Sequence, residues 1–214
     1  MRILAVDTAL GACSVAILDD DKVLAHSLTA MERGHAEALA PMVELAMQDA
    51  ACEFSGLDRL AVTTGPGTFT GQRVGLAFMR GLRVALDIPL VGMTTLSVMA
   101  KEAMAECRCG IGVAMHDARR DEVYLELVGE MQSPASVLPF SVAVARVASI
   151  AQPFVLAGTA APRAHQQLPQ ALVSAVRQPD ALWVARLARS LPVSEAPPKP
   201  LYLRPPDAKL PVRK

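Results

Sequence analysis

An acidic residue at the end of the first apolar run is the strongest chemical candidate in the chain. Residues 3–7 read ILAVD, so Asp7 closes a continuous apolar segment, and Thr8 and Gly11 lie in the turn that follows. A carboxylate beside free backbone N–H groups can hold magnesium and the phosphates of a nucleotide. Only one hydroxyl, that of Thr8, is present in this turn. The same residues are equally consistent with a leftover structural acid that caps N–H groups of the loop.

A second acid stands in a similar setting in the other half of the chain. Residues 111–117 read IGVAMHD and end at Asp117, and the charged turn ARRDE follows. A second phosphate-binding turn in this position needs glycine for close approach of the backbone, and residues 118–121 contain none. A salt-bridged hairpin tip and a docking surface stay open as alternatives.

The Gly-rich stretch GPGTFTG at residues 65–71 leads directly into a predicted helix. Free N–H groups and the dipole at a helix N-terminus suit an anion. The Walker pattern, however, requires Lys immediately after its last glycine, and Gln72 stands there. Thr68 or Thr70 as a helix cap explains the hydroxyl groups without any ligand.

Small residues recur beyond this turn, at Gly71, Gly75 and Ala77. They allow another helix to approach closely, and that helix can belong to this chain or to a partner. We expect Phe69 and Val74 to be exposed, which favours the partner.

Metal and hydrolase chemistry lack the residues they need. The four histidines contain no i, i+4 pair, the four cysteines follow no paired zinc spacing, and no G-x-S-x-G motif occurs. We therefore predict no metal site, and cysteines that are reduced and mostly buried.

Composition narrows the class of protein further. Lys and Arg number 21 against 21 Asp and Glu, so no net field attracts a polyanion, although residues 177–214 hold a local basic excess. Residues 1–7 are too short for a signal peptide, and no uncharged apolar run reaches the length of a membrane span. We expect a globular cytoplasmic protein.

Hydrophobic periodicity predicts an alternation of strands and helices. Strands are expected at 3–7, 12–18, 22–28, 60–64, 90–93, 111–117, 122–128 and 154–158, and helices from 35, at 71–87, from 94 or 95 to 106, at 141–151 and at 181–191.

The opening pattern of buried strand, acid, turn and alternating strand begins again at residue 111, which indicates a duplicated ribonuclease-H-like lobe. The predicted fold is α/β with two such lobes, the second one reduced. The expected boundaries are 1–106, 107–190, and a Pro-rich extended tail at 191–214.

Five segments in this order and spacing resemble the TsaB (YeaZ) family over nearly the whole chain. They read ILAVDTALGACSVAIL, GHAEALAP, GPGTFTGQRVGLAFMRGL, DARRDEVY and PLYLR. The resemblance implies the acetate-kinase/sugar-kinase/Hsc70/actin superfamily, in its glycoprotease-like branch. It also implies work with TsaD, the catalytic member, and TsaE in forming threonylcarbamoyladenosine on tRNA.

The resemblance further implies a non-catalytic subunit that pairs through helices of its first lobe, with itself when alone and with TsaD when assembled. Carried over, the interface comprises His35, Leu39, Phe69, Gly71, Arg73, Val74, Gly75, Ala77 and Phe78. Asp7, Thr8, Gly11 and Asp117 are then a vestigial nucleotide or phosphate site. No cofactor is expected to bind tightly, a nucleotide is expected only in the assembled complex, and tRNA contact is indirect. The alternatives are a small ATP-binding kinase or ATPase of the same superfamily, and a tRNA-binding module that uses the basic tail.

Overall fold

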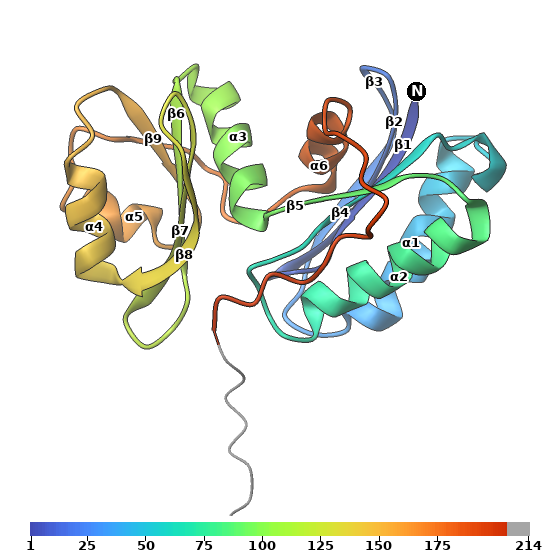
Figure 1. The fold of residues 1–214 in the computed structure, drawn as a ribbon, viewed down its shortest axis with the longest axis horizontal. Coiled ribbons are helices and arrows are strands. Elements are labelled where there is room, and N and C mark those ends of the chain that lie inside the picture. Colours follow the sequence, from blue (N-terminus) through green and yellow to red (C-terminus); the bar gives the residue numbers. More distant parts are fainter. Residues whose placement is uncertain (205–214) are drawn as a thin grey trace, which may run out of the picture.

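Two five-stranded mixed sheets lie side by side, with helices between them and on their outer faces (Figure 1). This computed structural model of the protein describes residues 1–204. The architecture is the two-lobed α/β fold that the repeated strand pattern predicts.

The first sheet has the strand order β3-β2-β1-β4-β5. Its strands are β1 (Arg2–Asp7), β2 (Ala12–Asp19), β3 (Lys22–Ala30), β4 (Arg59–Thr63) and β5 (Leu90–Met93). β1 is central, antiparallel to β2 and parallel to β4. Because helices cover both faces of the sheet, the interior of β1 is apolar throughout rather than alternating.

The second sheet has the order β10-β9-β6-β7-β8 and repeats this plan around β6. Its strands are β6 (Ile111–Asp117), β7 (Glu122–Gly129), β8 (Ser133–Pro139), β9 (Phe154–Ala157) and β10 (Leu172–Val173). β6 is antiparallel to β7 and parallel to β9, as β1 is to β2 and β4. The matching topology confirms the predicted duplication.

The helices form three layers around the two sheets (Figure 1). The helices are α1 (His35–Asp49), α2 (Gly71–Leu86), α3 (Thr95–Cys107), α4 (Phe140–Ala148), α5 (Ala161–His165) and α6 (Ala181–Ala188), with a 3-10 turn, η1, at Phe54–Gly56. α1 and α2 cover the outer face of the first sheet, α4 and α5 that of the second, and α3 and α6 lie between the sheets.

Each sheet takes its inner helix from the other half of the chain. α3 follows β5 in sequence but packs on β6, β7 and β9, whereas α6 packs on β1 and β2. Ala9 and Leu10, from the turn after β1, join α3 and the second sheet in one apolar cluster. The boundaries at residues 106 and 190 stay predictions, and this exchange means that the two halves share buried side chains across them.

Four short elements were missed by the sequence patterns: η1, β8, α5 and β10. β8 is an edge strand that contains Pro134 and Pro139, which is where proline is tolerated in a sheet but also where strand patterns are weakest. α5 has five residues and β10 two, too few for a periodic signal.

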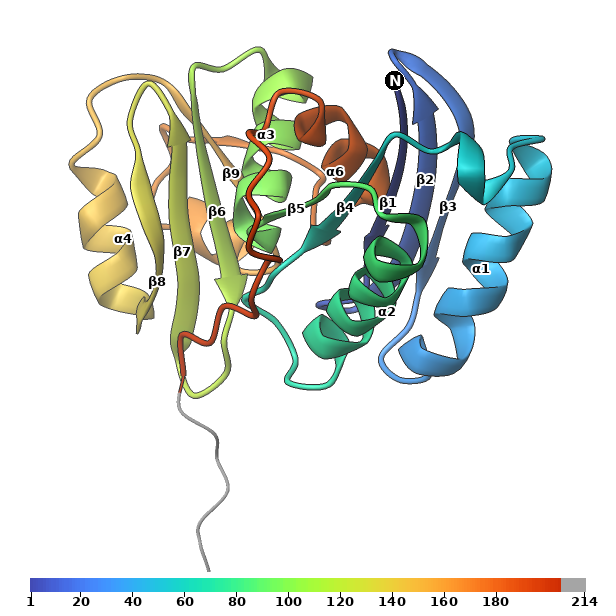
Figure 2. The same ribbon diagram turned by 45° about the vertical axis from the view of Figure 1, so that its right-hand side comes forward.

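Residues 191–204 contain no helix or strand, as the proline content predicts, and the last ten residues of the predicted tail lie outside the described part. Figure 2 shows this segment running along the molecule from α6. Within residues 1–204, no helix is both long and apolar enough to cross a bilayer. All four cysteines are free thiols, of which Cys13 and Cys52 are buried.

Candidate functional site

Asp7 ends β1 and is completely buried. Its Oδ1 accepts hydrogen bonds from the Thr63 hydroxyl and, at 3.4 Å, from the Ala9 N–H. Its Oδ2 is buried and has no hydrogen-bond partner within residues 1–204. Burial raises the pKa of Asp7 to about 7, against which the hydrogen bond from Thr63 works. Hard cations bind the ionised form of a carboxyl group, so magnesium at Asp7 would have to displace a proton that burial favours.

The turn that follows β1, residues 8–11, is called the first turn below, and its other polar groups also form hydrogen bonds within the chain. The Thr8 hydroxyl donates to the Gly71 carbonyl at 2.7 Å and accepts from the Gly75 N–H at 3.0 Å. The Gly11 N–H donates to Oε1 of Gln178 at 2.9 Å. The N–H and hydroxyl that could hold a phosphate are therefore both engaged by side chains or backbone of the protein itself.

The Gly-rich turn at residues 65–71 is used for close packing against the first turn. A Cβ at Gly67 would lie 2.2 Å from the Ala9 carbonyl oxygen, and a Cβ at Gly71 would lie 2.2 Å from the Thr8 carbonyl oxygen. The Thr68 N–H donates to the Ala9 carbonyl oxygen at 2.8 Å. The Thr68 hydroxyl accepts from the Gly71 N–H at 3.0 Å, as a capping residue does. Thr70 stands at the N-cap of α2 without a side-chain capping bond, so of the two predicted hydroxyl groups it is that of Thr68 that accepts an N–H at the start of the helix.

The small residues of α2 face two directions. Gly71 is buried against the turn that follows β1, and Gly75 is buried against that turn and the first sheet, where an added Cβ would lie 2.8 Å from the Thr8 hydroxyl oxygen. Gly75 therefore packs closely within the chain's own first lobe, and its place in a partner interface stays a prediction. Ala77 faces outward.

The remaining predicted contact residues divide in the same way. His35 and Leu39 of α1 are buried, and His35 Nε2 lies 3.1 Å from the Leu10 carbonyl oxygen. Val74 and Phe78 are half-buried against the core of the first lobe. Phe69 is 51% exposed.

The end of β6 differs from the end of β1. Asp117 is exposed, its Oδ1 accepts from the Arg119 N–H at 2.9 Å, and its own N–H donates to the Thr159 hydroxyl at 2.9 Å. Asp121 pairs with Arg163 at 2.8 Å, which supports the salt-bridged hairpin tip. No hydrogen bond or ion pair between described residues joins Asp117 to the residues around Asp7.

Sequence reasoning missed several residues that complete these sites. Thr63 and Gln178 lie far along the chain from Asp7 and Gly11, and no local pattern links a polar side chain to a turn 167 residues away. Arg204 donates to the Ala118 carbonyl oxygen at 2.6 Å. Its position in the PLYLR segment was the one available signal.

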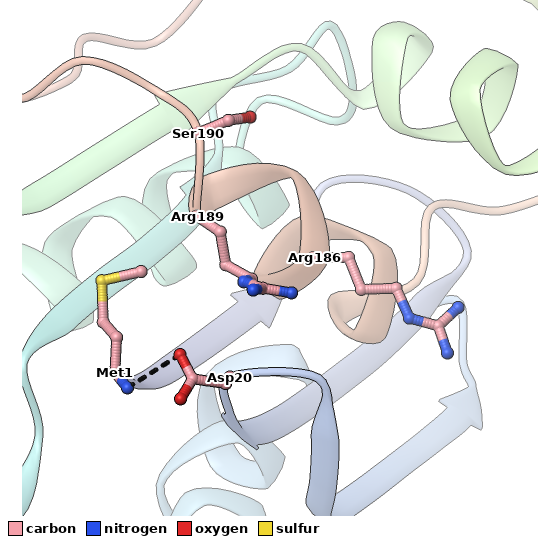
Figure 3. A pocket seen from close by; sticks show the side chains of 5 residues that line it. All are labelled: Met1, Asp20, Arg186, Arg189 and Ser190. Carbon is pink, nitrogen blue, oxygen red and sulfur yellow. Dashed lines mark hydrogen bonds and ion pairs between the residues drawn. The ribbon is translucent and has the colours of Figure 1, made fainter.

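A surface hollow lies away from these turns, at the start of β1 and the end of α6 (Figure 3). Its volume is about 430 Å³, and its charged groups already pair with one another or with neighbours. The N-terminal ammonium lies 3.0 Å from the Asp20 carboxylate, Arg189 pairs with Asp21, and Arg186 stacks on Trp183. Within residues 1–204, no group of three or more His, Cys, Asp or Glu side chains is arranged to hold a metal ion.

Comparison with known proteins agrees with the fold and the sequence motifs. The family model described as "TsaD: tRNA N6-adenosine threonylcarbamoyltransferase" matches residues 22–175. The chain is 39% identical over 124 residues to the Escherichia coli tRNA threonylcarbamoyladenosine biosynthesis protein TsaB, a match that covers 58% of this chain and 53% of that protein. This chain thus spans about half the length of the curated TsaB proteins that it matches.

Solved structures match over more of the chain. YeaZ from Pseudomonas aeruginosa aligns with a TM-score of 0.79 and 31% identity, covering 94% of this chain and 99% of that one. Component A of the Acidaminococcus fermentans (R)-2-hydroxyglutaryl-CoA dehydratase aligns with a TM-score of 0.56 and 13% identity over 87% of this chain and 97% of that one, a likeness of fold alone. The two-sheet α/β fold is thus shared with these proteins, and the chain belongs to the TsaB (YeaZ) family.

Proposed function

We propose that this protein is a non-catalytic subunit that pairs with and supports a TsaD-type enzyme, together with TsaE, in the formation of threonylcarbamoyladenosine on tRNA. The observation that carries the proposal is the state of the first turn. Asp7, Thr8 and Gly11, the groups that could hold magnesium or phosphate, are buried or hydrogen-bonded within the chain. The names of the curated relatives support the pathway.

The outer face of α1 and α2 supports pairing with another polypeptide. Val84 of α2 is 82% exposed and Leu45 of α1 is 56% exposed, and the neighbouring Ala77, Gly81 and Ala85 are also exposed. An aliphatic surface of small side chains allows close approach of a partner helix. An interface of about 1,600 Å² would be sufficient for a stable complex. The same face would pair two copies when the protein is alone.

The test replaces this apolar face with charge. Val84→Arg or Ala77→Arg leaves the core of the lobe untouched, because both side chains point outward, and should abolish co-elution with TsaD. Val142→Arg is the matched control, since Val142 is 50% exposed on α4 of the other lobe. Reconstituted threonylcarbamoyladenosine formation should fall in parallel with pairing. If both α2 variants still co-elute with TsaD as the wild type does, the proposed surface is wrong.

A second candidate, a small ATP-binding kinase or ATPase, is favoured by one observation. The buried Oδ2 of Asp7, without a hydrogen-bond partner among the described residues, stands at the strand end where such a fold would hold magnesium. Calorimetry of the isolated protein with ATP and magnesium separates the two candidates. Micromolar binding that disappears in Asp7→Ala would replace the first proposal with the second.

The remaining parts of the proposal concern ligands and place. No cofactor binds tightly to the isolated chain, and a nucleotide binds only at the interface of the assembled complex. The chain contacts tRNA through its partner, and it acts in the cytoplasm, where a tRNA-modifying complex has its substrate.

A further inference from the structure

The segment after α6, residues 192–204, crosses from one lobe to the other and is called the strap below. It contains Pro192, Pro197, Pro198 and Pro200. Prolines have no N–H and fix φ, so they pre-set an extended chain that cannot join a sheet as a regular strand. The strap is held instead by donors from the rest of the protein.

Arginines of α2 bind the strap along the first lobe. Arg83 donates to the Glu195 carbonyl oxygen at 2.9 Å, and Arg80 donates through Nε to the Pro198 carbonyl oxygen at 3.1 Å. The Leu201 N–H donates to the Thr64 carbonyl oxygen at 2.8 Å. These guanidinium groups meet neutral acceptors, so they serve to hold the strap rather than to neutralise acids.

The first lobe is also shaped to receive the strap. β5 is an edge strand, and a Cβ at Gly92 in this strand would lie 2.5 Å from Cβ of Pro198. Glycine at this position lets the strap lie directly against β5. A hollow of about 230 Å³ remains between β5 and the strap.

Aromatic contacts clamp the strap near its end. The Tyr202 ring stacks on Phe69 with 5.9 Å between ring centroids, and the Arg73 guanidinium lies 3.3 Å from the centroid of Phe69. Arg73 Nε also donates to the Tyr202 hydroxyl at 2.6 Å. Phe69 and Arg73 thereby bind this chain's own C-terminal segment.

The end of the strap reaches the second lobe. Arg204 donates to the Ala118 carbonyl oxygen at 2.6 Å and to the Arg119 carbonyl oxygen at 3.3 Å, and it forms an ion pair with Glu122. These groups belong to the tip of the β6–β7 hairpin. Arg119, Arg120 and Asp121 there all have positive φ, between 54° and 64°. Each such residue costs about 1–2 kcal/mol, so the tip needs contacts from outside to keep this conformation.

We propose that the strap is a structural link that couples the β5 edge and α2 of the first lobe to the hairpin tip of the second, with Arg204 as the positioning residue at its end. A change in how the strap sits on the first lobe is thereby transmitted to residues 117–122. The link does not depend on the proposed function, because it rests on contacts within the chain.

The first test disturbs the strap far from the tip. Gly92→Ala places a methyl group against Pro198, whereas Gly81→Ala, the matched control, has nothing within 4 Å of the added Cβ. Hydrogen exchange of the tip amides is the measurement, since the Ala118, Arg119 and Glu122 N–H groups are all hydrogen-bonded. Gly92→Ala should speed their exchange about tenfold or more, and Gly81→Ala should leave it unchanged. Unchanged tip exchange in a folded Gly92→Ala protein would overturn the proposal.

The second test starts from the other end and stays informative if Gly92→Ala fails to fold. Arg204→Gln removes the ion pair with Glu122 and the guanidinium hydrogen bonds to the hairpin tip. It should speed amide hydrogen exchange both in the tip and at Leu201. Arg146→Gln, at an exposed position on α4, is the control. An effect confined to the tip, or an equal effect in Arg146→Gln, would show that the strap does not transmit the change.

Discussion

The two turns that end β1 and β6 start from the same pattern and differ in how they are held. Each follows a buried strand that closes with an acid, Asp7 or Asp117. The first turn is packed from inside, with its acid completely buried and two glycines of the Gly-rich turn in backbone contact with it. The second is exposed, contains arginines, and is held from outside by Arg204.

This difference teaches how a duplicated lobe can lose a shared role. Glycine removes the side chain that would keep two backbones apart, so the first turn can be packed tightly enough to bury a carboxyl group. The second turn keeps the hairpin but replaces close packing by ion pairs that involve Glu122 and Asp121. The strand pattern of the lobes is thus preserved while the chemistry at the strand ends diverges.

The largest expected effect concerns the two acids that end β1 and β6, Asp7 and Asp117, and the pH dependence of stability. The pKa of Asp7 is raised to about 7, so at intermediate pH the folded protein keeps a proton that the unfolded chain has released. The free energy of unfolding must therefore fall as the pH rises through this range. Asp7→Asn cannot ionise, so its free energy of unfolding should lack this fall. Relative to the wild type, it should rise by about 3 kcal/mol as the pH increases from about 5 to about 8.

Urea denaturation at the two ends of this pH range gives the free energies of unfolding to be compared. Burial also raises the pKa of Glu102 to about 7 and lowers that of His116 to about 4, but both residues are present in the two proteins and their contributions cancel in the difference. Asp117→Asn, at the exposed counterpart, is the control for the loss of a carboxyl group at a strand end. A parallel profile for Asp7→Asn would show that Asp7 is ionised in the folded state.

A smaller effect is expected from the glycines that pack the first turn. In Gly71→Ala the new methyl group would lie 2.2 Å from the Thr8 carbonyl oxygen and 2.6 Å from the Thr68 hydroxyl oxygen, so the turn must move. Overpacking of this kind should lower the free energy of unfolding by about 2 kcal/mol. Gly81→Ala, in the same helix but in open space, should be neutral or stabilising. Equal stability of the two variants in urea would mean that the first turn is not tightly packed.

Much of the fold followed from the sequence because its signals are local. The strands at 3–7 and 111–117, the helix from 71 and the start of α3 at Thr95 all lie where periodicity and helix-start rules predict them. The exchange of α3 and α6 between the sheets could not be predicted, since an apolar helix face does not specify which sheet covers it. Gly75 shows the same limit, because a small residue indicates close approach without naming the neighbour.

The candidate site was predictable in its residues but not in its state. The pattern identified Asp7, Thr8 and Gly11, yet whether such groups face solvent or bond within the chain depends on Thr63 and Gln178, which are distant in sequence. The strap was predicted only as an extended tail, since its contacts depend on arginines that lie on one face of α2. Contacts between segments so far apart need the fold before they can be recognised.

The smallest expected effect has the opposite sign and sharpens the comparison at the second turn. Arg119 adopts a φ of 64°, where glycine costs nothing, and its N–H, which bonds to Asp117, is kept in any substitution other than proline. Arg119→Gly should therefore raise the free energy of unfolding by about 0.5 kcal/mol, the relief of strain less the added freedom of the unfolded chain. Arg119→Ala removes the same side chain but keeps the Cβ, so it should show no gain. If Arg119→Gly stabilises the second turn while Gly71→Ala destabilises the first, the second turn holds a strained backbone by contacts from outside. Identical effects of Gly and Ala at position 119 would show that the hairpin tip carries no such strain.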